Sequence, residues 1–364
     1  MDAAAQWAAA GLYDPEAPRA AERLELLEWF TSLGVSLQEM VAANANGQLN
    51  ALLGDRTLRP GRKLTAAEVS AAVGLSLADV AAVYRATGMP PYDDGDPVFS
   101  EEDLPMFHLF AQADAFFSRE ELIHFVRVLG TSMRRIAEAA SEMFLRDVEA
   151  PLHSGTHASE VELARANLAG VQLARSATGI FDPMFRLHLE VSTRTTRRAR
   201  VDVHDYATLP VTIGFVDLNG FTSRSATLTP GELLDLVMAF ESAATEAVSE
   251  HGGRLIKLIG DEVMFSAVDP GEACAIAASL VRHAAAIASG GRAGLAHGDV
   301  ITSGGDVYGD VVNLASRIAD IAVPGEVLVN EAVTQRATAH AFAPAGRRQL
   351  KGFAEPVRLW SLEL

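Results

Sequence analysis

The segment FVDLNGFT at residues 215–222, followed by KLIGD at residues 257–261, decides how the second half of this chain folds. The first segment ends an apolar run, Val211 to Val216, that is typical of a buried strand, and the glycine-containing turn behind it can present backbone N–H groups to phosphate. The second segment lies between two short apolar runs, a pattern that predicts a hairpin. Asp217 and Asp261 therefore stand at strand ends beside a turn. Two hard oxygen ligands in such places are typical of a nucleotide site that uses Mg²⁺.

A third motif, DVYGDVVNLASR, follows at residues 306–317. Its pattern D-x-x-G-x-x-V-N-x-A-x-R, together with F-x-D-L-x-G-F-T and K-x-I-G-D, resembles the catalytic domain of class III nucleotidyl cyclases. The resemblance covers residues 208–364, down to the LKG turn at 350–352 and a final strand over 357–362. Three motifs in the order and spacing of the family carry this resemblance, where one short motif would be weak support.

The pattern of this half predicts the order strand, helix, strand, strand, helix, strand. A capping box at residues 229–232 predicts a helix to Ser249, and a second helix is expected over 270–289, followed by a strand over 293–297. The fold class is therefore α+β, a ferredoxin-like βαββαβ catalytic domain. The resemblance implies added strands, one at 325–330 and one near the C-terminus. We expect the helices to cover one face of the sheet and to leave the other face for a partner.

The candidate metal and phosphate ligands follow the first strand. Asp217 and Asp261 each adjoin an apolar strand, and they are expected to bind two divalent ions, Mg²⁺ or Mn²⁺, with the carbonyl of Leu218 as a third ligand. Backbone N–H groups of the following turn would hold the β- and γ-phosphates of a nucleotide. A lysine in the LKG turn resembles a phosphate-contacting lysine of the family. The phosphate-binding candidates are Asn219, Gly220, Phe221, Thr222 and Lys351.

Lys257 and Asp306 are the candidate readers of the base. Lys257 stands in an otherwise apolar strand, where an ammonium group needs a partner, and Asp306 is the matching anion. Adenine offers an acceptor at N1 and a donor at N6, which suit a lysine and an aspartate, whereas guanine presents the reverse pattern. Guanylyl cyclases of the family replace this pair, so the resemblance implies ATP as the substrate. A purely structural ion pair is the alternative.

Asn313 and Arg317 are the candidate catalytic residues. They lie four residues apart in a helical segment and therefore share one face. The amide can orient the ribose 3′-hydroxyl, and the guanidinium can neutralise charge on the α-phosphate. The motifs together imply an adenylate cyclase, which forms 3′,5′-cyclic AMP and pyrophosphate by two-metal-assisted attack of the 3′-hydroxyl. In the family the metal aspartates come from one chain and the base-reading pair, the asparagine and the arginine come from its partner, so a homodimer with shared sites is expected.

Two other functions stay open on the sequence. One is a catalytically silent signalling module that keeps the cyclase fold, although all six key positions are occupied as the active family requires. The other is a transcription regulator, because residues 64–107 resemble the start of MerR-type regulators, with a degenerate helix-turn-helix. Residues 61–110 hold three basic and eight acidic residues, the opposite of the charge that DNA binding needs. The GGDVY at 304–308 lacks the signature of diguanylate cyclases.

Residues 1–190 are predicted to form a helical regulatory domain. Helix-start signals recur at Ser36, Thr65, Ser76 and Ser118. Within residues 119–148 an apolar stripe is expected to belong to the domain core or to pack against its twin in a dimer, and the alternative is a groove for a small apolar ligand such as a fatty acid. Histidines in this half make protons a second candidate signal. The stripe consists of Leu122, Phe125, Val126, Leu129, Met133, Ile136 and Met143.

Charge and composition bound the remaining questions. The basic stretch at 194–200 predicts a linker, placed at residues 191–207, between the regulatory domain and a catalytic domain at 208–364. The net charge of −17 disfavours nucleic acid as a partner. Cys274 is the single cysteine, so an intramolecular disulfide is excluded. The N-terminus has no basic region of a secretory signal, and no apolar run reaches the roughly 18 residues of a membrane span, so we expect a cytoplasmic protein.

Overall fold

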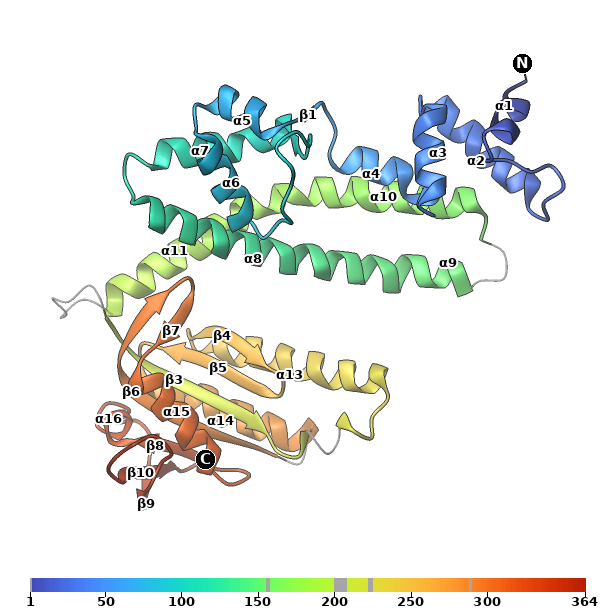
Figure 1. Ribbon diagram of the computed structural model, residues 1–364. Coiled ribbons are helices and arrows are strands. Elements are labelled where there is room, and N and C mark those ends of the chain that lie inside the picture. Colours follow the sequence, from blue (N-terminus) through green and yellow to red (C-terminus); the bar gives the residue numbers. More distant parts are fainter. Residues whose placement is uncertain (1, 155–157, 200–207, 222–224, 288–289) are drawn as a thin grey trace. The chain divides into compact units, whose positions relative to one another are not determined.

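The chain folds into two compact units, Met1–Arg186 and Leu187–Leu364. The computed structural model in Figure 1 describes residues 2–154, 158–199, 208–221, 225–287 and 290–364. The first unit is helical and the second is built around a β-sheet. Each unit contains its own buried apolar clusters, so each has the core that an independent domain needs.

Helices make up nearly all of the first unit, and its longest helices follow Asp114. Two short strands, β1 (Lys63–Leu64) and β2 (Phe99–Ser100), pair antiparallel. The predicted helical N-terminal region is confirmed. The helices are α1 (Ala3–Ala9), α2 (Ala20–Ser32), α3 (Leu37–Ala45), α4 (Leu52–Leu58), α5 (Ala66–Val73), α6 (Leu77–Ala86), α7 (Leu104–Ala113), α8 (Arg119–Phe144), α9 (Ala150–Ser154), α10 (Glu160–Ala177) and α11 (Phe181–Ala199), the last of which continues into the second unit.

Four of these helices begin at the predicted signals. Ser36, Thr65 and Ser118 each form a capping box with the glutamate three residues later, and Ser76 accepts a hydrogen bond from the N–H of Asp79. Each cap satisfies a backbone N–H group that has no partner inside the helix. Helices α5 and α6 bend by 108° across their turn, an angle that suits the predicted helix-turn-helix.

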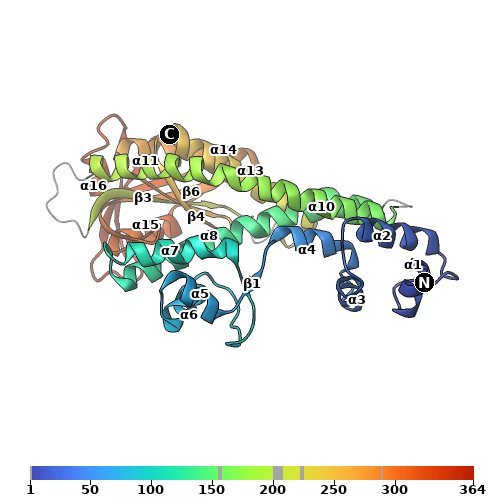
Figure 2. The ribbon, with the colours of Figure 1, turned by 90° about the horizontal axis from the view of Figure 1, so that it is seen from above.

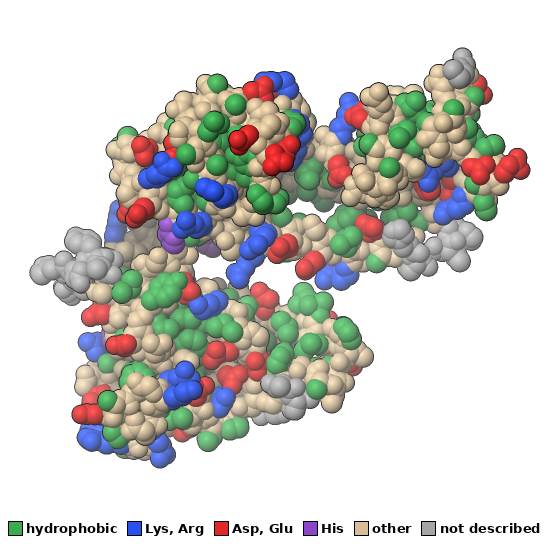
Figure 3. All heavy atoms as spheres, in the orientation of Figure 1, with side chains coloured by type: hydrophobic (Ala, Val, Ile, Leu, Met, Phe, Trp, Pro, Cys, Tyr) green, Lys and Arg blue, Asp and Glu red, His purple; other side chains and the backbone are tan. Residues whose placement is uncertain are grey.

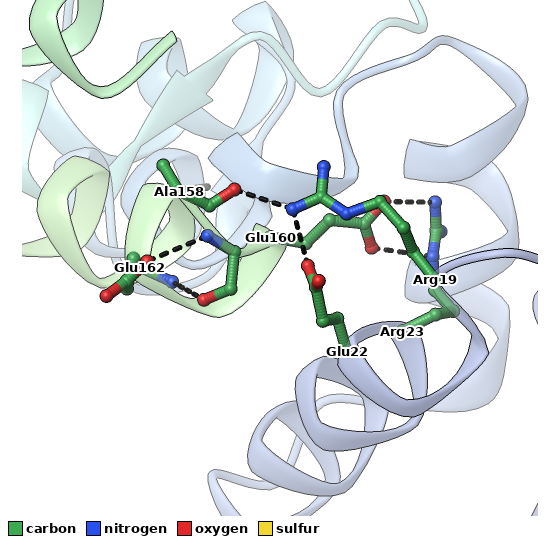
Figure 4. A network of polar contacts seen from close by, with 7 residues as sticks. Arg19, Glu22, Arg23, Ala158, Glu160 and Glu162 are labelled. Carbon is green, nitrogen blue, oxygen red and sulfur yellow. Dashed lines mark hydrogen bonds and ion pairs between the residues drawn. The ribbon is translucent and has the colours of Figure 1, made fainter. Parts of the chain in front are cut away.

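The long helix α10 joins the two ends of the first unit. It packs along α2 and α4 (Figure 2). Figure 4 shows Arg19, the N-cap residue of α2, and Arg23 of α2 reaching the start of α10. Arg19 donates to the carbonyl of Ala158 at 2.7 Å, and Arg23 pairs with the carboxylate of Glu160 at 2.7 Å. Because the second pair is half-buried and hydrogen-bonded, it fixes the position of α10 on α2 more firmly than an exposed pair would.

The apolar stripe of α8 is buried at one end only. Leu122 and Val126 belong to a core cluster with α5, α6 and α7, whereas the other five residues of the stripe are 38–55% exposed. Domain core, the first form of the prediction, is therefore wrong for those five, and packing against a second copy stays a prediction. A stripe shows which face favours burial, but here α6 packs only on the first half of α8, where Gly130 lets the helix approach the backbone of Thr87. Next to that contact lies an apolar groove of about 570 Å³, lined by residues that include Met89, Met106, Val126, Leu129 and Met133.

The second unit has the predicted order of elements, with additions. The ferredoxin-like core and the strand over 357–362 are confirmed, and an additional strand, β9, has no counterpart in the prediction. The elements are β3 (Leu209–Leu218), α13 (Pro230–Glu250), β4 (Arg254–Ile259), β5 (Glu262–Ala267), α14 (Pro270–Ile287), β6 (Gly291–Ser303), β7 (Asp306–Tyr308), α15 (Asp310–Ile321), β8 (Val327–Asn330), α16 (Glu331–Thr334), β9 (Phe342–Arg348) and β10 (Val357–Leu362).

The sheet of the second unit has the strand order β4-β5-β3-β6-β8-β10-β9, and β7 pairs with the end of β6. All neighbours are antiparallel except β6 and β8. Strand β3 lies at the centre of the ferredoxin-like part, between β5 and β6, and its register sets Asp217 opposite Glu262 on one side and Arg292 on the other. Three charged side chains therefore form one row across the sheet.

Helices cover both faces of this sheet, which corrects the expectation that one face would be left bare. Helices α13 and α14 pack with alternate strand residues such as Val216, and α15 packs on the opposite face with residues such as Phe215. Gly294 of β6 explains how α15 fits there. A Cβ atom at this position would lie 2.2 Å from the nitrogen of Ala319 and 2.5 Å from the carbonyl oxygen of Ala315. The missing side chain lets the helix backbone rest directly on the strand.

The basic stretch assigned to a linker is helical where the structure describes it, because α11 continues to Ala199. Ion pairs four residues apart, Arg186 with Asp182 and Arg194 with Glu190, support the helix, and neither glycine nor proline follows Pro183 of its first turn. Residues 200–207 lie outside the described part of the chain.

The surface mixes both signs of charge. On the face that Figure 3 shows, Lys and Arg side chains are scattered among Asp and Glu. No single helix in the described ranges is long and apolar enough to cross a membrane, and only the bent pair α5 and α6 passes such a test together.

Candidate active site

The structure brings the two predicted metal ligands together. Asp217 is near the end of β3, and Asp261 occupies the turn between β4 and β5, where Gly260 takes the left-handed conformation with φ +64°. The N–H of Leu218 donates to the carbonyl of Asp261 at 3.2 Å, so the two strand ends are joined at this point. Burial and the neighbouring charge of Asp217 raise the pKa of Asp261. The two carboxylates thus share a region of excess negative charge.

Arg292, which the sequence reasoning missed, balances part of this charge. Its Nε and Nη2 atoms donate to Oδ2 of Asp217 at 3.0 and 2.8 Å, and its Nη1 atom donates to the carbonyl of Asp320 at 2.9 Å. The side chain of Arg292 therefore also satisfies a carbonyl at the C-terminal end of α15. A lone basic residue at the start of a predicted strand was the available signal, but only the register of β3 and β6 pairs it with Asp217.

Glu262 is a third carboxylate at the same place, and it was also missed. Its pKa is raised to about 7, first by burial and then by the charges of Asp217, Asp320 and Asp261, while Arg292 opposes the rise. Even so, no group of three or more His, Cys, Asp or Glu residues within the described ranges is arranged to hold a metal ion. A metal here would have to complete its coordination with backbone and substrate oxygens.

The turn after β3 is only partly available to phosphate. The N–H of Asn219 donates to the carbonyl of Gly290 at 2.9 Å, because the pairing of β3 with the β6 segment continues one residue beyond the strand. The ring of Phe221 packs against the core, and Gly220 has φ +75°, as a tight turn requires. Thr222 lies outside the described residues. The expectation that every N–H of this turn is free therefore does not hold for Asn219.

Lys257 and Asp306 form the predicted pair. The Nζ atom of Lys257 lies 2.6 Å from Oδ2 of Asp306, and the N–H of Val307 donates to Oδ1 of Asp306 at 2.9 Å. Burial opposes ionisation of this carboxyl, but the hydrogen bonds from Lys257 and Val307 hold the pKa of Asp306 below its ordinary value. The side chains of Lys257 and Asp306 are 39% and 29% exposed, so a base can still reach them.

Asn313, Arg317 and Lys351 line one pocket of about 460 Å³. The first two project from α15, and Lys351 comes from the turn between β9 and β10, which Gly352 permits with φ +91°. Arg317 pairs with the carboxylate of Asp320 at 2.7 Å. This pocket contains two cations and an amide, which are the groups that bind phosphate and ribose oxygens. Neither Asp217 nor Asp261 lines this pocket, but Arg317 reaches Asp320, whose carbonyl accepts from the same Arg292 that binds Asp217.

Both units of the chain resemble parts of known proteins. Residues 2–194 match the family described as an adenylate cyclase regulatory domain, and residues 203–363 match the adenylate and guanylate cyclase catalytic domain. An uncharacterized protein of Mycobacterium tuberculosis is 34% identical over 97% of this chain and 92% of its own length. A pH-sensitive adenylate cyclase of the same species is 29% identical over 93% of this chain and 87% of its own length. The crystal structure of the adenylyl cyclase CyaB from P. aeruginosa, 22% identical, corresponds to 43% of this chain and 95% of that chain, with a TM-score of 0.40.

Proposed function

We propose that this chain converts ATP into 3′,5′-cyclic AMP and pyrophosphate with the site residues described above. The chain belongs to the adenylate cyclase family and is an adenylate cyclase. The observation that carries the proposal is the single pocket that collects Asn313, Arg317 and Lys351 from distant parts of the chain. A surface role would not require an amide and two cations to converge from a helix and a remote turn. Ribose and phosphate binding does require it.

Lys257 and Asp306 select adenine in this proposal. The lysine donates to N1, and the aspartate accepts from the N6 amino group. The pair at 2.6 Å supplies the donor and the acceptor side by side, as the edge of adenine demands. Guanine would meet a donor with its own donor at N1, which leaves buried groups unpaired and costs about 1–3 kcal/mol for each contact.

Asn313 and Arg317 act at the reacting centre. The Asn313 amide holds the ribose so that the 3′-hydroxyl attacks the α-phosphorus in line, and Arg317 stabilises the charge that develops on the α-phosphate. Arg317 is available for this role because its pair with Asp320 is exposed, and exposed pairs contribute only about 0–1 kcal/mol. Lys351 then binds the departing pyrophosphate.

Asp217 and Asp261, with the carbonyl of Leu218, would hold two Mg²⁺ or Mn²⁺ ions. The donor set fits these ions, because it consists of oxygen atoms on adjoining strand ends, where burial and the charge of Asp217 raise the pKa of Asp261. When bound, such ions activate the 3′-hydroxyl and neutralise charge on the phosphates. Arg292 keeps the Asp217 carboxylate oriented through two hydrogen bonds to Oδ2.

Two copies of the chain would share each active site. One copy supplies Asp217 and Asp261, and the second supplies the base-reading pair with Asn313 and Arg317, so a two-fold dimer forms two equivalent sites. The lining of the pocket, which does not include Asp217 or Asp261, supports this division. A monomer is expected to be inactive.

The helical unit tunes this activity. Its match to an adenylate cyclase regulatory domain supports the role, and two signals are open to it. The groove beside α8 suits a small apolar ligand, and the relative named as a pH-sensitive adenylate cyclase supports protons as the signal.

Mixing two inactive variants tests the shared site. Asp217→Ala and Asn313→Ala should each be nearly inactive, but a mixture that has exchanged subunits should recover about a quarter of wild-type turnover, because half of the dimers carry one intact site. Production of cyclic AMP is the measurement.

The matched control is a mixture of Asp217→Ala with Asp261→Ala. Both changes affect the same half of the site, so no dimer in that mixture has an intact site and no activity should return. Equal inactivity of both mixtures after demonstrated exchange would show that the catalytic residues work within one chain.

A further inference from the structure

A β-bulge in β4 sets two cations side by side. Arg254 pairs with Ser266 and Leu255 with Phe265, but Lys257 pairs with Met264, so one additional residue stands in β4. In a regular strand, residues three apart point to opposite faces of the sheet. The bulge removes this alternation, and because Ser266 and Met264 share a face, Arg254 and Lys257 share it too.

Both cations engage the turn between β6 and β7. A terminal nitrogen of the Arg254 guanidinium donates to the carbonyl of Gly305, while Lys257 binds the carboxylate of the next residue, Asp306. Gly304 and Gly305 have φ of +58° and +82°, a left-handed pair that favours glycine and that the Arg254 contact holds in place. The charge of Arg254 also helps to keep Asp306 ionised.

We propose that Arg254 is a positioning residue for adenine recognition, an inference that rests on the proposed function of Lys257 and Asp306. Asp306 accepts from Lys257 through Oδ2 and from the N–H of Val307 through Oδ1. The remaining lone pairs of the Asp306 carboxylate are directed at the adenine only while the turn at Gly304 and Gly305 keeps its conformation. Arg254 fixes it from the strand that also carries Lys257, so the donor and the acceptor for adenine move as one unit.

This role differs from that of a contact that only stabilises the packing of β4 on the β6–β7 hairpin. Loss of such a contact would lower the stability of the fold and leave the choice of nucleotide unchanged. A positioning residue changes the choice between nucleotides, because a mobile Asp306 accepts less well from the N6 amino group of adenine and excludes guanine less strictly.

The test compares Arg254→Met with Arg254→Lys in the full-length chain. We expect Arg254→Met to raise the KM for ATP and to lower the ratio of the GTP inhibition constant to that KM by roughly tenfold, with kcat at saturating ATP changed much less. Arg254→Lys, which keeps a charged donor, should recover most of the ratio. Arg358→Met removes an exposed arginine from β10 of the same sheet and should leave all three constants unchanged. If Arg254→Met does not fold, Arg254→Gln takes its place, with a smaller change in the same direction.

Lys257→Met separates the inference from its premise. If Lys257→Met leaves the nucleotide preference intact, adenine recognition by this pair is wrong and the role of Arg254 is wrong with it. If Lys257→Met lowers the preference but Arg254→Met lowers only the melting temperature, the proposed function stands and the inference about Arg254 is overturned. A double variant whose loss of preference is less than the product of the two single losses would support action on one shared group.

Discussion

The sheet unit and the helical unit treat their apolar side chains in opposite ways. Both faces of the sheet are covered from within the second unit, by α13 and α14 on one face and by α15 on the other. Helix α8 of the first unit instead leaves Phe125, Ile136 and Met143 between 43% and 55% exposed. The polar site residues of the second unit are therefore carried by a sheet that is packed on both faces. Helix α8, in contrast, exposes an apolar surface that the first unit does not cover. Fixed polar groups suit catalysis, and an uncovered apolar surface suits a regulatory contact.

Changes to the fixed polar groups should have the largest effect. Reversing the pair by Lys257→Glu with Asp306→Cys should lower kcat/KM for ATP by at least about 100-fold, because two buried contacts to adenine are lost together. Binding of Mn²⁺ should change far less, since Asp217 and Asp261 are untouched. Turnover of ATP at the wild-type rate would contradict the assignment of this pair to adenine recognition. The claim that the sheet unit holds fixed polar groups for catalysis would then lose its main example.

A stability measurement tests the other side. Leu122→Ala should lower the free energy of unfolding by about 2 kcal/mol, because Leu122 is 8% exposed and packs in a core cluster. Ile136→Asp on the same helix, at a residue 43% exposed, should change it by less than about 0.5 kcal/mol. Urea unfolding of both variants measures the difference. An equal loss in both would mean that a second copy or another partner covers the stripe of α8 in solution.

The smallest expected effect concerns Glu262, for which no ion pair is found among the described residues of the sheet unit. Its folded pKa of about 7 exceeds the ordinary value of 4.5, so the folded chain binds more protons than the unfolded chain between these pH values. The free energy of unfolding therefore falls as the pH rises through this interval, and the full penalty is present above it. Glu262→Gln should be more stable than wild type by about 1 kcal/mol at pH 8, and equally stable at pH 4.

Thermal unfolding in the presence of a chelator measures this difference, because a bound cation would itself stabilise the carboxylate. Glu246→Gln removes an exposed acid from α13 and serves as the control. A gain from Glu262→Gln that is the same at both pH values would show that burial of its charge is not the cause.

Sequence patterns gave the elements of the sheet unit because its signals are local. The capping box at Thr229 and the apolar runs of β3 and β5 each report on a few neighbouring residues. The position of α15 could not be predicted in this way. It depends on Gly294, whose meaning appears only when the strand and the helix are set against each other.

The same limit applies to the site. Lys257 and Asp306 were predicted as partners because an ammonium group in an apolar strand requires an anion, and the structure joins them. Arg292 and Glu262 were missed because their link to Asp217 is a matter of register across three strands. For the exposed part of the α8 stripe, amphipathic spacing gave the face that favours burial but could not decide between the domain core and a second copy as the surface that buries it.

Gly294 also constrains how such an enzyme can diverge. Every missense change in a glycine codon adds a side chain, and at this position the first added carbon would collide with the backbone of Ala315 and Ala319. No repacking of neighbouring side chains relieves a collision with backbone atoms. Lineages that acquire a new substrate are therefore expected to vary the outward side chains of α15 while this codon stays constant, and a mutagenesis library for altered nucleotide use gains nothing by randomising it.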